Sequence, residues 1–395
     1  MPRFEPFEGL RYNLDRVPIA QVTAPPYDVI DDDDRAALIR RHGENIVAVD
    51  LPRADQGSPY TAAAETIRQW RAASVLVDDA QPTFTIYRMD FTDELGRRRH
   101  TTGVIGALAL SRPGEGGILP HEHTTPKAKS DRLELLRATA VQLSPIWGLS
   151  PAAGLSDLLD LGRPPAASWT DDDSVTHSVW IDDDDDHLRE ISALLAAEPI
   201  VIADGHHRYE TSLAYRDERR AQQGPGPYES VMALVVELIE DQLSVLPIHR
   251  LLRGLPDGFD VLTALTPFFE PTRLDHFDVE AIERLTGAGT LGLVTTEGSW
   301  LLRPRTDVLA EARDLDSSRL DLALASFPEH ELAFQHGVDN VVARVEKGDA
   351  DAGVLLRPAT TAQIIEIAHG GERMPPKTTF FHPKPRTGVV LRDVS

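Results

Sequence analysis

Residues 204–208, Asp-Gly-His-His-Arg, concentrate charged and titratable side chains directly after an apolar run. The apolar run, Ile200–Ala203, is typical of a buried strand, and a helical pattern follows the motif. We therefore predict a strand, a tight turn and a helix. A helix start carries a partial positive charge, Gly205 lets a ligand approach the backbone, and the guanidinium of Arg208 pairs with phosphate or carboxylate. The segment is predicted to bind an anion.

The neighbouring side chains give this anion site groups that can move protons. His206 or His207 is predicted to neutralise or position a transferred group, and Glu210 to orient a neighbouring histidine or Arg208. Asp204 is a favourable residue to cap the start of the helix. The alternative interpretation keeps only this cap and places the histidines at the surface.

A second polar segment, around His121 and Glu122, precedes a basic run in an otherwise acidic chain. Glu122 is the candidate base for a substrate hydroxyl, with His121 as the second choice. His121 and His123 would point the same way in an extended chain and could bind a metal, but no third ligand is identifiable. The alternative is a charged loop before a helix. The basic run suits a phosphorylated ligand and consists of Lys127, Lys129 and Arg132.

The C-terminal tail alternates cations with aromatic rings. Such a pattern suits a base-plus-phosphate ligand, and equally a terminal segment that packs on the core. Lys377 is our candidate phosphate ligand from this tail. The residues concerned are Lys377, Phe380, Phe381, Lys384 and Arg386.

Tyr27 and Asp28 follow two prolines, which restrict the backbone before them. We assign both residues to a substrate site. An ordinary turn is the alternative interpretation.

Composition excludes several classes of function. Acidic residues outnumber basic ones 63 to 40, which gives a net charge of −23 and disfavours general nucleic-acid binding. The chain has no cysteine, so thiolate metal sites and cysteine nucleophiles are excluded. The apolar stretches are too short for a membrane span and the N-terminus has no signal region, which favours the cytoplasm. The aspartate runs at 31–34, 171–173 and 182–186 are interpreted as solvated loops.

The elements that must position these residues alternate between helix and strand. A Gly-x-Gly-x-x-Gly match at 287–292 stands between a helix and a strand, the reverse of a dinucleotide-binding order, and is interpreted as a helix end. Helices are expected over 32–42, 59–73, 130–141 and 187–197, and strands over 83–90, 102–110, 200–203 and 231–237.

The fold class expected from this alternation is α+β, or mixed α/β. Residues 1–255 are expected to form a core that carries the motifs. Residues 256–346 form an additional α/β subdomain, and residues 347–395 return to the core.

The whole chain resembles the family catalogued as domain of unknown function 1015. The segments that carry the resemblance are Ala24–Ile30, His121–Glu122, Asp131–Arg132, Ala203–Thr211 and Met374–Lys384.

A more distant resemblance links Asp204–Arg208 to the Gly-x-His-Arg segment of the ParB and sulfiredoxin superfamily, nearest to its free-serine kinases. It implies a ParB/sulfiredoxin-like nucleotide-binding core, with nucleotide phosphates at Gly205–Arg208. It also implies ATP, or ADP or CTP, with Mg²⁺. Sulfiredoxin chemistry needs a cysteine, which this chain lacks, and a DNA-clamp role is opposed by the net charge.

These observations predict a nucleotide-dependent phosphotransferase that acts on a small hydroxyl metabolite, with free L-serine as one candidate. Lys129 and Arg132, or Lys377, would complete the phosphate shell around Arg208. One alternative is a nucleotide-binding regulatory or sensor protein without turnover. A second alternative is a metal hydrolase that uses the histidines His121, His123, His206 and His207. The metal ligands and the oligomeric state are not predicted.

Overall fold

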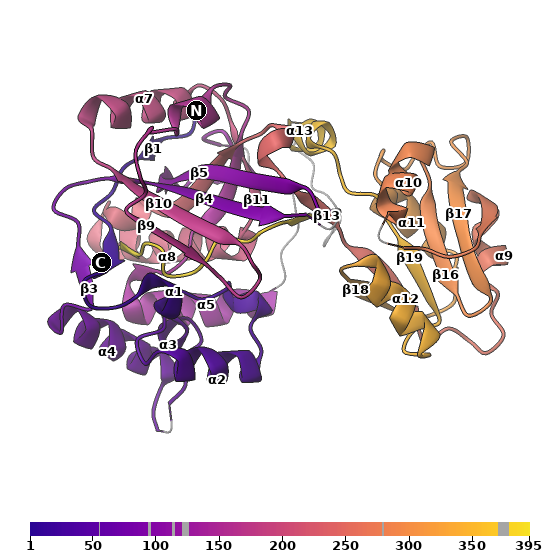
Figure 1. The fold of residues 1–395 in the computed structure, drawn as a ribbon, viewed down its shortest axis with the longest axis horizontal. Coiled ribbons are helices and arrows are strands. Elements are labelled where there is room, and N and C mark those ends of the chain that lie inside the picture. The colour runs from indigo at the N-terminus through magenta and orange to yellow at the C-terminus, as the bar shows by residue number, and fades with distance from the viewer. Residues whose placement is uncertain (55, 94–95, 113–114, 121–125, 279, 370–378) are drawn as a thin grey trace. The chain divides into compact units, whose positions relative to one another are not determined.

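The computed structural model describes residues 1–395 except 55, 94–95, 113–114, 121–125, 279 and 370–378. The chain divides into two compact units (Figure 1). Unit 1 comprises Met1–Thr92, Arg98–Leu243 and Pro383–Ser395. Unit 2 comprises Asp93–Arg97 and Ser244–His382.

Unit 1 is built on a mixed sheet in the order β6-β11-β8-β12-β5-β4-β10-β9, with β1 paired to β5. The pairs β6–β11 and β8–β12 are parallel, and the other pairs are antiparallel. Every residue of β12 is buried, which explains its continuous apolar sequence. The strands are β1 (Phe4–Glu5), β4 (Phe84–Thr92), β5 (Arg98–Ala109), β6 (Ile118–Pro120), β8 (Ile146–Ser150), β9 (Ala167–Thr170), β10 (Thr176–Asp182), β11 (Ile200–Asp204) and β12 (Ser230–Glu237).

The helices of unit 1 bury their apolar faces, some against this sheet and others against neighbouring helices and short strands. On α4, Ala63, Ile67 and Trp70 recur at helical spacing and are buried. The α-helices of unit 1 are α1 (Ile19–Val22), α2 (Asp32–Arg41), α3 (Val47–Asp50), α4 (Pro59–Ala72), α5 (Pro126–Thr139), α6 (Leu155–Leu158), α7 (Asp185–Ala196) and α8 (His206–Gln223).

Short elements complete unit 1. Strand β2 (Leu10–Tyr12) pairs with β3 (Leu76–Asp78), and β7 (Val141–Gln142) pairs with β21 (Arg392–Asp393) from the C-terminus. The short 3-10 helices are η1 (Tyr27–Val29), η2 (Pro227–Glu229) and η3 (Glu240–Gln242).

Most residues of the aspartate runs are exposed, as expected, but several also have structural roles. Asp31 caps α2 in a reciprocal capping box with Asp34, and Asp184 caps α7. Asp182 is buried and pairs with His187, and the side chain of Asp171, which is 6% exposed, pairs with His177.

Unit 2 holds a second, antiparallel sheet in the order β15-β17-β16-β19-β14-β18. Helix α10 ends at Gly289 in a left-handed conformation, with φ of 67°, which confirms that 287–292 contains a helix end. The strands of unit 2 are β13 (Val245–Pro247), β14 (His249–Arg253), β15 (Phe269–Leu274), β16 (Leu291–Thr295), β17 (Gly298–Pro304), β18 (Glu331–Gln335), β19 (Ala352–Leu355) and β20 (Thr379–Phe381). Its helices are α9 (Val261–Leu265), α10 (Ala281–Ala288), α11 (Asp316–Leu324), α12 (Val338–Glu346) and α13 (Thr361–His369).

The expected α+β class agrees with this architecture of one large mixed sheet, a second sheet and many helices. The compact units end at other residues than the expected boundaries at 255 and 346. Those boundaries would leave β14 and β19 outside the accessory subdomain, but the two strands pair with each other in the sheet of unit 2. None of the helices in the described ranges combines the length and the apolar character that a membrane span requires.

Candidate functional site

The predicted strand, turn and helix are present at the anion motif. Strand β11 ends at Asp204, Gly205 follows with φ of 89°, and α8 begins at His206. The N-cap position is occupied by Gly205 without a side-chain cap, so the prediction that Asp204 caps the helix is wrong. The carboxylate of Asp204 instead pairs with two cations.

Acidic and basic side chains alternate in a row across this turn. Asp204 lies 2.7 Å from Nη2 of Arg208 and 3.4 Å from Nζ of Lys384. Lys384 lies 2.7 Å from the carboxylate of Asp28. The Lys384 ammonium therefore lies between two carboxylates that are far apart in sequence.

The two central charges stabilise each other. Burial alone would raise the pKa of Asp204, but Lys384 and Arg208 outweigh it and the pKa is lowered. Burial would likewise lower the pKa of Lys384, but Asp204 and Asp28 raise it. Both side chains are therefore charged at neutral pH.

Arg208 is anchored to the loop before β8 as well as to Asp204. Its Nη1 donates to the hydroxyl of Ser144, at 3.0 Å, and to the carbonyl oxygen of Pro145. With the bond to Asp204, three of the donors that a guanidinium offers are directed to the protein. Arg208 therefore holds a fixed orientation beside the turn.

A second charged group lies beside Arg208 in the same unit. The guanidinium of Arg132 stacks on the ring of Tyr27, 4.4 Å from its centroid. Arg132 donates to Oδ1 of Asp50 at 2.9 Å and to Asp131 at 2.6 Å. Burial raises the pKa of Asp50, although Arg132 partly offsets this effect.

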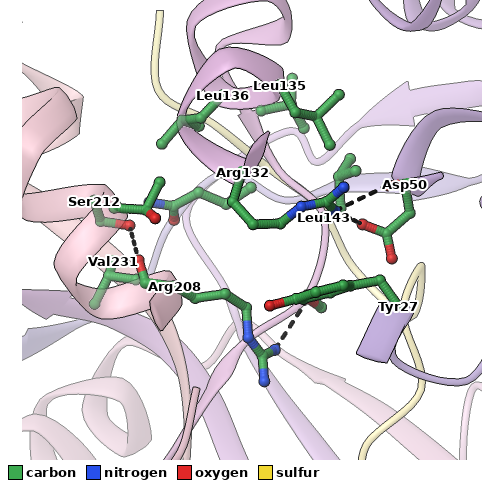
Figure 2. Close-up of a pocket in the computed structure, with 13 residues that line it drawn as sticks. Tyr27, Asp50, Arg132, Leu135, Leu136, Leu143, Arg208, Ser212 and Val231 are labelled. Atoms are coloured by element: carbon green, nitrogen blue, oxygen red, sulfur yellow. Dashed lines mark hydrogen bonds and ion pairs between the residues drawn. The ribbon is translucent and has the colours of Figure 1, made fainter. Parts of the chain in front are cut away.

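These residues and an apolar wall line a pocket of about 60 Å³ (Figure 2). Figure 2 shows Arg132 and Arg208 on opposite sides of Tyr27, with leucine side chains from α5 above them. Arg208 belongs both to this pocket and to the charged row at the turn. The pocket is lined by Tyr27, Asp50, Arg132, Leu135, Leu136, Val141, Gln142, Leu143, Ser144, Arg208, Thr211, Ser212 and Val231.

The structure brings several predicted site residues together. Tyr27 and Asp28 lie beside Arg132 and Lys384, respectively. Arg132 is buried and its donors face two carboxylates, so its charge is already balanced within the protein. This arrangement fits a structural role for Arg132 better than direct contact with a phosphate.

The remaining predicted residues of the motif lie on α8. His206 is buried at the helix start, and His207 follows it in the first turn. Glu210 is half-buried on the same helix and does not line the pocket.

Other predicted residues cannot be placed. His121, Glu122 and Lys377 lie outside the described residues, and so does the side chain of Lys129 on α5. Strand β6, which ends at Pro120, runs parallel to β11, with Pro120 beside Ile202.

Sequence reasoning missed three contributors to the site. Asp50 ends a four-residue helix without any motif, and Ser144 stands in an ordinary loop. Lys384 was grouped with the basic tail but was not chosen as a site residue. The prolines on both sides of Lys384, which restrict its backbone, were the sequence feature that could have indicated a fixed position for this side chain.

The described residues contain no cluster of three or more His, Cys, Asp or Glu side chains arranged to hold a metal ion. Asp28 and Asp204 nevertheless provide two carboxylates that share one cation. Mg²⁺ in nucleotide sites is commonly bound by one or two carboxylates together with phosphate oxygens. In this structure the ammonium of Lys384 lies between the two carboxylates, where such an ion would bind.

Comparison with known proteins identifies a family. The family model described as "Protein of unknown function (DUF1015)" matches residues 4–323. No curated protein matches the sequence.

Solved structures show weak similarity. A conserved hypothetical protein from Pyrococcus furiosus is 16% identical, over 67% of this chain and 87% of that one, with a TM-score of 0.34. A free serine kinase in complex with AMP is 16% identical, over 71% and 88%, with a TM-score of 0.37. SbnI from Staphylococcus aureus, with a C-terminal truncation, is 13% identical, over 71% and 84%, with a TM-score of 0.40. Scores this low do not establish a shared fold, so function must be inferred from the site itself.

Proposed function

The chain belongs to the DUF1015 family of proteins of unknown function, and from its site we propose that it is a nucleotide-dependent phosphotransferase acting on a small hydroxyl metabolite. Free L-serine is one candidate acceptor. The observation that carries the proposal is the row Arg208, Asp204, Lys384 at the start of an 18-residue helix, beside the pocket that Arg208 itself lines.

The phosphate end of the proposed site is the turn at Gly205. Helix α8 directs its positive end towards this turn, and Arg208 and Lys384 add two fixed cations. Together they suit the negative charge of a nucleotide polyphosphate. The proposal includes a ParB/sulfiredoxin-like nucleotide-binding core for unit 1, supported by the strand, glycine turn and helix at 200–223.

The proposed reaction transfers the terminal phosphoryl group of ATP. The acceptor hydroxyl oxygen bonds to the γ-phosphorus, the bond to the bridging oxygen breaks, and ADP leaves. A base takes the hydroxyl proton, for which Glu122 is our first candidate and His121 the second. Asp28 and Asp204 would hold Mg²⁺, which neutralises phosphate charge when it is bound.

A first experiment tests the nucleotide site. We expect ATP, ADP or CTP to bind in calorimetric titrations with Mg²⁺, and Arg208→Ala to weaken binding by about tenfold to a hundredfold, the effect of losing a charged hydrogen-bond partner. Arg220→Ala is the matched control, because Arg220 stands in the last turn of the same helix and is exposed. Failure of all three nucleotides to bind would refute the proposal. Equal losses in both variants would refute the assignment of Arg208.

A second measurement separates turnover from binding alone. The protein is incubated with ATP, Mg²⁺ and hydroxyl compounds that include L-serine, and phosphorus NMR follows the products. A new phosphate ester together with ADP supports the phosphotransferase. Binding with no ester from any acceptor favours the regulatory or sensor alternative.

A further inference from the structure

Asp50 is a buried carboxylate that uses only one of its two oxygens. Its side chain is 5% exposed, and Oδ1 accepts a bond from Arg132 at 2.9 Å. Oδ2 has no hydrogen-bond partner among the described residues. Because a buried acceptor without a donor is costly, this oxygen calls for an explanation.

A second unpaired oxygen belongs to the same pocket. Thr211, on the second turn of α8, is buried, and its hydroxyl has no partner in the described part of the chain. Thr211 and Asp50 both line the pocket shown in Figure 2, although they come from α8 and α3. Two independent elements thus each place a buried, unpaired oxygen on a residue that lines one cavity.

The rest of the pocket wall is mainly apolar. The side chains that form it come from α5, β7, the loop before β8, and β12. They are Leu135, Leu136, Val141, Leu143 and Val231. A ligand that fills this space therefore needs an aliphatic body and a hydrogen-bond donor.

The charges around the pocket favour a cationic donor. Asp50 and Asp131 share one guanidinium, that of Arg132, which leaves one negative charge in this ion-pair cluster. An ammonium group would balance that charge and donate to the unpaired oxygen of Asp50. An added carboxylate would be repelled by Asp50 and would find Arg132 already paired with two carboxylates.

We propose that this pocket binds a small aliphatic compound through its ammonium group, which donates to Oδ2 of Asp50 while the carbon skeleton packs on the leucines. Thr211 adds a second acceptor. The inference rests on the proposed function in one respect, because such a compound, carrying a hydroxyl near Arg208, would be the phosphoryl acceptor. Amino alcohols and hydroxyl amino acids share this chemistry.

The test uses probes with one carbon skeleton and different polar ends, bound to the full chain without nucleotide. The probes are 3-methylbutylamine, 3-methylbutanol and 3-methylbutanoate, followed by calorimetry or ligand-observed NMR. We expect the amine to bind about tenfold or more tightly than the other two, the effect of one charged hydrogen bond. Equal binding of alcohol and amine, or preference for the carboxylate, would overturn the proposal.

Variants locate the ammonium. Asp50→Asn should weaken amine binding by about tenfold and abolish the preference for the amine. The control is Asp131→Asn, because Asp131 also pairs with Arg132 but is exposed. This variant should change amine affinity by less than about threefold. Thr211→Val keeps the shape and the charge and should weaken amine binding by about threefold, which keeps the test valid if Asp50→Asn does not fold. No loss in either pocket variant would contradict the assignment.

Two further arms separate this inference from the proposed function. L-Leucine adds a carboxylate to the same amine, so its affinity relative to 3-methylbutylamine distinguishes amino acids from simple amines as the natural class. If ATP displaces the amine, the pocket holds the nucleotide base and the inference is wrong. If the amine binds and no nucleotide does, the inference stands and the phosphotransferase fails.

Discussion

Gly205 is the residue on which the geometry of the anion turn depends. Its φ of 89° lies in the left-handed region, and a Cβ there would lie 3.1 Å from Nε and Nη2 of Arg208. The methyl group of Ile146 would be equally close. A side chain at this position would therefore strain the backbone and require Arg208 and Ile146 to shift by a few tenths of an ångström.

We predict that Gly205→Ala destabilises the protein by about 1–2 kcal/mol through backbone strain and also weakens nucleotide binding by about tenfold. Urea unfolding and calorimetric titration with ATP measure the two effects. Gly224→Ala is the matched control, because Gly224 at the other end of α8 has φ of 80° and no atom near its Cβ position. Equal nucleotide affinity in the two variants would show that the position of Arg208 does not matter.

At the scale of elements, local patterns predicted most helices and strands but not the contacts between them. The expected helix at 59–73 is α4, and the expected strands at 83–90 and 102–110 belong to the paired strands β4 and β5. These elements were predictable because burial of one face imposes a period on the sequence. The strand and helix around the anion motif were found in the same way.

The missing contacts depend on long-range packing that leaves no local pattern. Lys384 reaches Asp28 across 356 positions of sequence, and no periodicity encodes such a contact. Asp171 is expected in a solvated loop, but its side chain is only 6% exposed, and His177 and Arg386 bind its carboxylate. The sequence did not indicate this ion pairing, because Asp171 belongs to a run of three aspartates that is typical of an exposed loop.

Strand β14 places His249 in the core of unit 2, where it must remain neutral. The side chain is 1% exposed, and Nδ1 accepts the backbone N–H of Leu356 at 3.2 Å. Burial lowers its pKa from 6.5 to about 3, assisted by His336 and Arg250. His249 therefore binds a proton below about pH 6.5 in the unfolded chain, but only below about pH 3 in the folded chain.

We predict that the contribution of His249 to stability is complete above pH 6.5 and is lost as the pH falls towards 3. At pH 4.5 the loss should be on the order of 3 kcal/mol. His249→Asn, whose amide oxygen replaces the acceptor, should show a weaker pH dependence over this range. Urea-dependent hydrogen exchange of the β14 amides measures the free energy of unfolding at each pH, and the variant His276→Asn, at an exposed position, is the control. Parallel pH profiles for wild type and His249→Asn would contradict the prediction.

At the scale of the whole molecule, the chain leaves unit 1 after Leu243 and returns at Pro383. The next residues inward, Ser244 and His382, share a backbone hydrogen bond of 2.9 Å, which continues the pairing of β13 with β20. The two connections to unit 1 are therefore neighbours in space. The returning segment is part of the core of unit 1, since Leu391 exchanges backbone hydrogen bonds with Leu10 and is buried.

This connectivity predicts that a short Gly-Ser linker can replace residues 244–382 and leave unit 1 folded, because the ends to be joined are already adjacent. Arg208, Asp204, Asp28 and Lys384 all belong to unit 1. We therefore expect the shortened chain to bind ATP within about threefold of the full chain, less than the effect of one charged contact. Circular dichroism and calorimetry provide the two measurements, and Arg208→Ala in the shortened chain confirms that the same site is measured. A folded shortened chain that binds ATP more than about tenfold weaker would instead assign part of the phosphate shell to the removed residues, where Lys377 is the candidate cation.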